Sequence, residues 1–202
     1  MKNNPFLSAY ELLDSAIMKG ANSALRAYNW ATGGTKTELS NDILTIAAVL
    51  DSAMIIQNPL TGAIYTSLQV YNSHFTQIVN NFQEKSENKA LENGAKDIWV
   101  ENRNKLNCLL GNMWGVSGYF HLMLSYSFFQ ANNINAIPEA VLIAANLSRG
   151  LAHHVMRLEG MPPRKNCISR GLEKLTYAYE SATAKPTLAP AALQEQNSLT
   201  AF

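Results

Sequence analysis

The sequence predicts an all-α protein, a single irregular bundle of about six helices followed by a flexible tail. Three observations favour this class. Apolar residues recur every three or four positions along most of the 202-residue chain, and pairs rich in glycine, asparagine or proline separate these stretches. No convincing run alternates polar and apolar residues as a half-buried strand would. A chain of this length buries one ordinary core without a disulfide or metal.

Composition excludes several classes of protein. Charged residues make up 15% of the chain and hydrophobic residues 47%, which excludes disorder throughout. The net charge of +1 lacks the strong field of a protein that coats nucleic acid or an acidic membrane. Two cysteines, Cys108 and Cys167, do not make a disulfide scaffold. The first residues, 1–5, show no basic-then-apolar export segment, so we expect a cytoplasmic protein.

The first two expected helices are bounded by turn residues. The first runs from about Pro5 to Trp30 and ends at the glycine pair 33–34. Ser40 or Asn41 is the expected N-cap of the second, which stops before Pro59 because proline disfavours helical geometry in the residue before it.

The third helix carries the most regular pattern in the chain. Its apolar residues follow an unbroken 4-3-4-3-4 spacing, which predicts a long bundle helix packed along one partner helix: Ile64, Leu68, Tyr71, Phe75, Ile78 and Phe82. The polar stretch 83–97 is expected to be a solvent-exposed connection.

Residues Leu106–Phe129 contain no formal charge, which raises the alternative of a membrane span. Asparagine, serine and histidine side chains in the stretch are costly in lipid, whereas its glycines suit close helix packing. We therefore expect a central helix, surrounded by neighbours. Apolar residues between 141 and 158 predict a further helix, and those between 168 and 179 a last one. The expected organisation is a helical bundle domain over 1–184 and a flexible tail over 185–202, rich in alanine, proline and polar residues.

No catalytic, cofactor or metal motif is found in the sequence. The bundle lacks the Glu-x-x-His pairs of carboxylate-bridged metal sites, and the two cysteines lie too far apart in sequence for a zinc knuckle. His121, on the uncharged helix, is interpreted as a core histidine, with a haem or metal ligand as the rarer alternative. We therefore predict no catalytic residue, no cofactor and no metal.

Basic residues gather in the C-terminal part of the chain. Between positions 149 and 185 seven basic side chains face three acidic ones, and this segment is the predicted partner-binding surface. Two apolar residues of the tail, Leu193 and Phe202, are expected to order on a partner. The basic members of the surface are Arg149, Arg157, Arg164, Lys165, Arg170 and Lys174.

Arg149 and His154 together form an Arg-x4-His pattern. This pattern is similar to the signature of HEPN ribonucleases, which are α-helical and cut RNA in a cleft formed by a dimer. The resemblance covers six residues and implies that Arg149 stabilises phosphate charge while His154 acts as general acid and base. Gly150 stands where HEPN motifs usually carry a polar residue.

The function predicted from these patterns is that of a non-enzymatic helical adaptor or chaperone-like subunit of a larger bacterial protein assembly. It would bind a protein partner through an apolar face and the basic C-terminal surface. A HEPN-like ribonuclease that uses Arg149 and His154 is the alternative, with RNA ranked below protein as a partner. A membrane-associated subunit that uses Leu106–Phe129 is the further alternative. For the adaptor itself, membrane contact is expected only through a partner.

Overall fold

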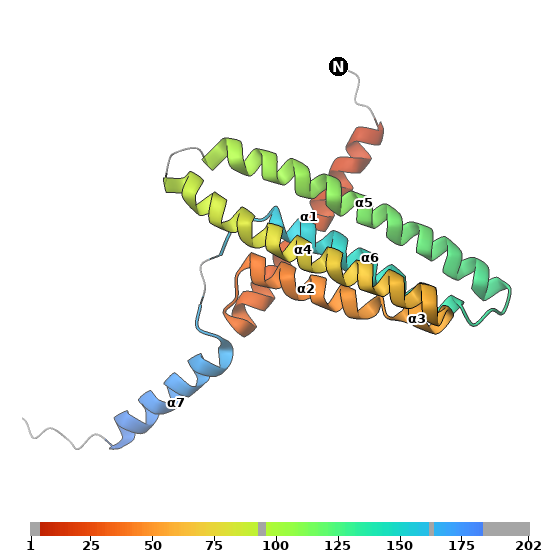
Figure 1. Ribbon diagram of the computed structural model, residues 1–202. Helices are drawn as coiled ribbons and strands as arrows, with labels where there is room; N and C mark the ends of the chain where they lie inside the picture. Colours follow the sequence, from red (N-terminus) through yellow and green to blue (C-terminus); the bar gives the residue numbers. More distant parts are fainter. Residues whose placement is uncertain (1–4, 93–95, 162–163, 184–202) are drawn as a thin grey trace, which may run out of the picture. The chain divides into compact units, whose positions relative to one another are not determined.

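The computed structural model describes residues 5–92, 96–161 and 164–183, and within these ranges every regular element is an α-helix. The predicted all-α class is therefore confirmed. The chain divides into two units, Met1–Asn166 and Cys167–Phe202. The first holds six helices, shown in Figure 1: α1 (Pro5–Thr32), α2 (Lys36–Leu50), α3 (Ala53–Gln57), α4 (Pro59–Glu92), α5 (Lys96–Gln130) and α6 (Ala136–Met156). The second holds α7 (Cys167–Thr183); the expected tail over 185–202, with Leu193 and Phe202, lies outside the described residues.

The short turn between α1 and α2 depends on local backbone chemistry. Gly33 has a φ of +81°, which a side chain would strain, and a Cβ there would overlap the carbonyl of Arg164. Thr35 is the N-cap of α2: its side chain accepts a hydrogen bond from the backbone of Glu38, and the Glu38 side chain accepts one from Thr35. The prediction of a cap at Ser40 or Asn41 was wrong because this capping box begins the helix at Thr35, five or six residues earlier.

Helix α6 is the centre of the first unit. It packs against α1, α2, α3 and α5, and more than half of its residues are buried. The prediction that Leu106–Phe129 forms the central helix was wrong, because one side of α5 packs on α6 and the other side is exposed. The core includes one cluster between α1, α2 and the end of α6, formed by Ala21, Leu25, Leu39, Val155 and Leu158.

Helices α5 and α6 approach each other closely at glycines. A Cβ on Gly111 would lie 2.6 Å from Nε2 of His154, and one on Gly150 would lie 3.0 Å from the carbonyl oxygen of Gly111. Small residues at these crossings allow the two backbones to pack without displacing side chains. The expectation that glycines of this stretch serve packing is therefore confirmed at Gly111.

The stretch 83–97 was expected to be an exposed connection, and this was wrong for most of it. Helix α4 continues to Glu92 and α5 begins at Lys96, so the two form a long antiparallel pair (Figure 1). Gln83 is buried, and Glu87 forms ion pairs with Lys36 and Arg103. Polar residues that look like a connection in the sequence are therefore the contact between α2, α4 and α5.

Candidate functional site

The apolar seam of α4 faces solvent. Its six residues, which we call the α4 row, are 53–70% exposed: Ile64, Leu68, Tyr71, Phe75, Ile78 and Phe82. The buried face of α4 is instead polar, with Ser73, Asn80 and Gln83 turned inwards. The spacing was correctly interpreted as a helical stripe, but the prediction that the stripe packs along a partner helix of the same chain was wrong. None of the described helices of the first unit covers it.

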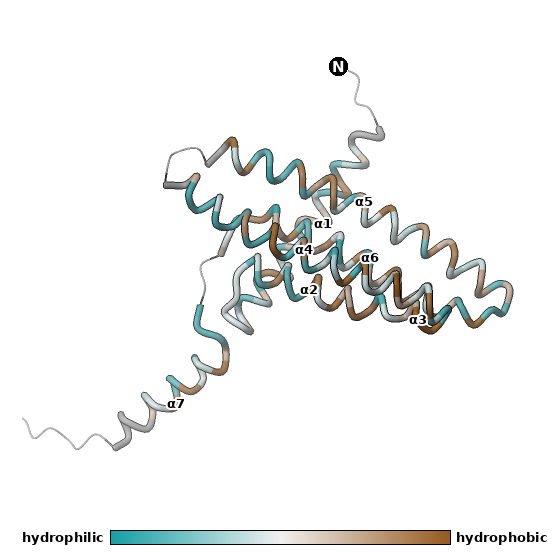
Figure 2. Tube along the Cα trace, in the orientation of Figure 1, coloured by the Kyte–Doolittle hydropathy of each residue, from teal (hydrophilic) through white to brown (hydrophobic). Residues whose placement is uncertain are grey.

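A second exposed stripe runs along α5. Its residues, which we call the α5 row, follow a 3-4-3-4-3 spacing and are 47–63% exposed: Leu106, Leu109, Met113, Val116, Phe120 and Met123. The opposite side of this helix is buried at Arg103, Asn107, Gly111 and Gly118. Figure 2 shows hydrophobic positions recurring among polar ones along both long helices.

The two rows border a groove between α4 and α5. The groove has a volume of about 430 Å³, and its walls include Phe75 from the α4 row and Leu106 and Met113 from the α5 row. Polar side chains line the same groove deeper in the bundle, among them Asn80, Asn107 and His153. The site therefore combines an apolar rim with a polar, buried floor.

Hydrogen bonds fix the side chains of the floor. Asn107 Nδ2 donates to Oε1 of Gln83 at 3.2 Å, which leaves Asn107 Oδ1 to accept from Nδ1 of His153 at 3.2 Å. Asn80 Nδ2 donates to Oγ of Ser40 at 3.0 Å. Burial lowers the pKa of His153 to about 4, so its imidazole is neutral at pH 7. The floor can accept and donate hydrogen bonds but carries no charge.

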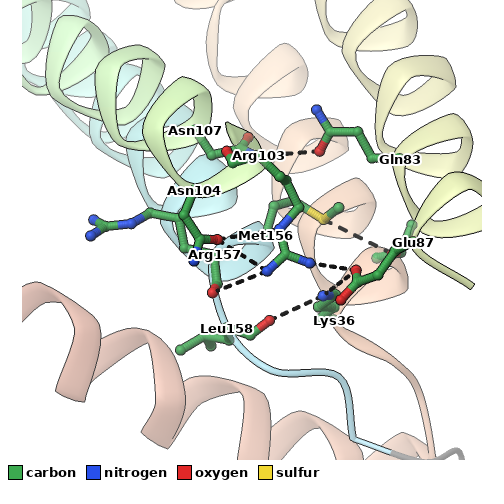
Figure 3. Close-up of polar contacts among 10 residues, drawn as sticks. Lys36, Gln83, Glu87, Arg103, Asn104, Asn107, Met156, Arg157 and Leu158 are labelled. Atoms are coloured by element: carbon green, nitrogen blue, oxygen red, sulfur yellow. Dashed lines mark hydrogen bonds and ion pairs between the residues drawn. The ribbon is translucent and has the colours of Figure 1, made fainter. Parts of the chain in front are cut away.

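An ion-pair network joins α2, α4 and α5 on the side of the groove nearest the α4–α5 connection (Figure 3). Glu87 on α4 pairs with Arg103 on α5 and with Nζ of Lys36 on α2, the latter at 2.9 Å. Lys36 Nζ also donates to the carbonyl oxygen of Leu158 at 3.0 Å. Burial lowers the pKa of Lys36. Burial alone would raise the pKa of Glu87, but Lys36 and Arg103 hold that pKa below its ordinary value. The network therefore fixes α4 and α5 to each other and to α2 at this end of the pair.

Arg149, the first residue of the predicted basic surface, is fully buried. Its guanidinium forms a two-pronged ion pair with Asp51, which is also fully buried, and lies 4.9 Å from the ring centre of Trp114. The expectation that Arg149 faces a partner was therefore wrong. From the sequence, an arginine within an amphipathic pattern is expected to face solvent. Its burial becomes evident only when the structure places an aspartate opposite it.

The remaining predicted basic residues do not form one exposed group. Arg157 pairs with Asp14 through both carboxylate oxygens, at 2.6 and 2.9 Å, and is half-buried. In the first unit Arg164 and Lys165 are exposed. In α7 Lys174 is exposed and Arg170 is half-buried.

His154 of the Arg-x4-His pattern is buried as well. Its Nδ1 accepts a hydrogen bond from Arg157 at 2.9 Å, and its ring lies against the backbone of Gly111. Burial and the charge of Arg157 lower its pKa. Arg149 binds Asp51 and His154 binds Arg157, so in this conformation neither side chain reaches solvent to meet a phosphodiester.

His121, the other candidate ligand, lies on α5 and forms a hydrogen bond with Glu139 of α6, with Nδ1 and Oε2 2.6 Å apart. Glu139 also accepts a hydrogen bond from Nε2 of Gln57 at 3.0 Å. In the described part of the chain no three histidine, cysteine, aspartate or glutamate side chains gather closely enough to hold a metal ion.

Sequence reasoning found the α4 row but missed the α5 row and the exposure of both. One signal was present: positions 106, 109, 113, 116, 120 and 123 repeat the heptad spacing on a helix already interpreted as central. Two heptad stripes on consecutive helices, joined by a polar segment, indicate an antiparallel pair with two seams to cover.

Among the described residues one helical stretch, Lys36–Gln57, is long and apolar enough to cross a membrane by length and composition. A single such stretch is weak evidence because the core helix of a soluble protein has the same properties. Leu106–Phe129, the stretch weighed as a span from the sequence, is not among such stretches. No protein family, curated protein or solved structure matches this chain.

Proposed function

We propose that the chain is a non-enzymatic helical subunit that binds a protein partner through the α4 row, the α5 row and the groove between them. The observation that carries this proposal is the exposure of twelve large apolar side chains in two ordered rows. Scattered apolar residues are normal on a protein surface, but a contiguous apolar patch rimmed by polar residues is typical of an interaction site.

The heptad order of the rows supports a helical protein partner. Residues spaced alternately by three and four fit as knobs between the side chains of a second helix, as they do in bundles and coiled coils. In the proposed mode an amphipathic helix of the partner would lay its apolar face along the rows and over the groove between them.

Burial of Arg149 and the pairing of Arg157 with Asp14 leave the basic C-terminal segment a smaller part in this proposal. Exposed basic side chains of this segment, such as Arg164, would affect the rate and salt dependence of association more than its strength.

A capture experiment with matched variants tests the proposal. The tagged chain is expressed in its native host, cross-linked, purified and analysed by mass spectrometry. One variant carries Phe75→Glu and Phe120→Glu, which place a charge in each row. The control carries Asn88→Glu and Asn102→Glu, at exposed positions of the same helices outside the rows. We expect cross-links from the rows to a protein partner in the wild type and the control, and their loss in the row variant.

Two results would contradict the proposal. The first is equal cross-linking by the row variant and the control, which would mean that the rows do not bind protein. The second is RNA cleavage by the purified chain that disappears in His154→Ala, because removal of a proton-transfer group typically costs about 10²–10⁴-fold in rate. That result would favour the ribonuclease alternative, with Arg149 and His154 exposed in another conformation.

A further inference from the structure

The α4 row and the α5 row have the same chemistry. Neither contains a charged residue, and the segments 59–83 and 106–130 lack lysine, arginine, aspartate and glutamate altogether. Two such surfaces can meet face to face without contact between like charges. An acidic or a basic partner surface would meet no opposite charge here. An uncharged apolar surface, such as this surface itself, is the better match.

Polar neighbours of the α4 row favour helices over lipid as the occupant. Ser67, His74 and Asn81 form a second stripe beside the row, seven residues apart, and all three are exposed. Side chains at such flanking positions stay in water at the edge of a helix–helix seam, whereas a lipid-facing helix would bury them in hydrocarbon at a cost.

The exposed area agrees with a stable dimer. Large apolar side chains carry on the order of 100 Å² of apolar surface or more, and about half of each is exposed here, so twelve of them present on the order of 600–1,000 Å². A standard stable interface buries roughly 800 Å² on each partner. The rows thus supply enough apolar surface for a self-associating interface with no contribution from other elements.

We propose that this surface binds the same surface of a second copy of the chain, so that the α4–α5 pairs of two copies form a four-helix interface in a homodimer. The α5 row of each copy packs into the groove of the other, with Phe75, Leu106 and Met113 at its walls, and two-fold symmetry makes both contacts equivalent. This inference rests on the proposed function and names its partner.

Sedimentation velocity and light scattering on the purified full-length chain test the dimer. We expect the wild type to have twice the 22.2 kDa mass of one chain at micromolar concentrations and to dissociate on dilution. The variant with Phe75→Glu and Phe120→Glu should be a folded monomer because both side chains are already exposed in one copy, with its dimer dissociation constant raised by roughly 100-fold or more. The Asn88→Glu, Asn102→Glu control should remain a dimer. Far-ultraviolet circular dichroism confirms that all three are folded.

The outcomes separate this inference from the proposed function. A wild-type chain that stays monomeric overturns the dimer. If it nevertheless loses a different protein partner in the row variant, the proposed function stands with another occupant. A monomer that instead floats with vesicles of phosphatidylcholine and phosphatidylglycerol, and loses this property in the row variant, overturns both and assigns the rows to a bilayer. A dimer that the row variant leaves intact also overturns the inference, because association then uses another face.

Discussion

Removal of the Asp51 carboxylate is the most direct test of the buried ion pair between Asp51 and Arg149. Asp51 and Arg149 are both fully buried, and in the described part of the chain Arg149 Nε has no hydrogen-bond partner, so Asp51 provides most of what compensates the buried guanidinium. Asp51→Asn keeps the shape and leaves the cation unpaired, which typically costs about 3–5 kcal/mol. Because 1 kcal/mol corresponds to roughly 2–4 °C for a chain of this size, the melting temperature should fall by about 6–20 °C.

The matching partner variant and a double variant complete the test. Arg149→Met removes the cation, leaves the carboxylate buried and should cost a similar amount. The double variant, Asp51→Asn with Arg149→Met, should cost clearly less than the two single changes together because neither charge is left unpaired. Glu101→Gln is the control: it removes a salt bridge to Lys105 whose side chains are 66% and 69% exposed, and it should leave the melting temperature unchanged.

Thermal unfolding followed by far-ultraviolet circular dichroism, at one fixed protein concentration, measures all four variants. A fall below about 2 °C for Asp51→Asn would refute the reasoning, because so small an effect means that water reaches the guanidinium. Strict additivity in the double variant would also refute it, since side chains that form one buried pair must be coupled.

Three further predictions concern other parts of the first unit. Gly111→Ala should destabilise the protein by about 1–3 kcal/mol because its Cβ would lie 2.6 Å from Nε2 of His154. Gly115→Ala, with no atom within 4 Å of the added Cβ, should be neutral or stabilise the protein by up to about 1 kcal/mol. Urea unfolding of the two variants measures the difference. His153 has a pKa of about 4 when folded and about 6.5 when unfolded, so the unfolded state binds more protons between these values and the free energy of unfolding falls as pH falls. From pH 7.5 to 5 the wild type should therefore lose about 2 kcal/mol more stability than His153→Gln. Equal losses would show that His153 is not buried as a neutral side chain. Phe75→Ala should lower the free energy of unfolding by less than about 1 kcal/mol at concentrations where the chain is monomeric. Leu142→Ala, whose side chain is fully buried, should lower it by about 2–5 kcal/mol. Equal losses in chemical denaturation would place the α4 row in the core.

The sequence predicts the helices better than it predicts their environment. The spacing from Ile64 to Phe82 identifies a helical stripe because side-chain periodicity is a local property. Whether that stripe is covered depends on where α2, α5 and α6 lie, and no local pattern contains this information. The same reason explains Arg149: its neighbours along α6 are compatible with an exposed basic face, and its partner Asp51 is 98 residues away.

Boundaries were least predictable where polar residues serve contacts between helices. Glu87 stands in the stretch 83–97 that looks like a solvent-exposed connection, but its ion pair with Arg103 joins α4 and α5. The capping box at Thr35 could have been identified from the sequence, since threonine followed three residues later by glutamate is a signature of a helix start.

The buried ion pairs have a consequence for how the helices find their alignment. The Asp51–Arg149 pair and the network around Glu87 each join different helices at a single height in the bundle. A helix that slides by one turn moves its side chains by about 5.4 Å, which breaks such a pair while it still allows apolar stripes to overlap. A misaligned bundle would therefore retain much of its apolar contact but hold unpaired charges in its interior. The ion pairs therefore raise the free energy of misaligned packings that an interior made only of leucine and alanine would tolerate. Their role is to select the correct alignment of the helices, whereas apolar burial drives the helices together.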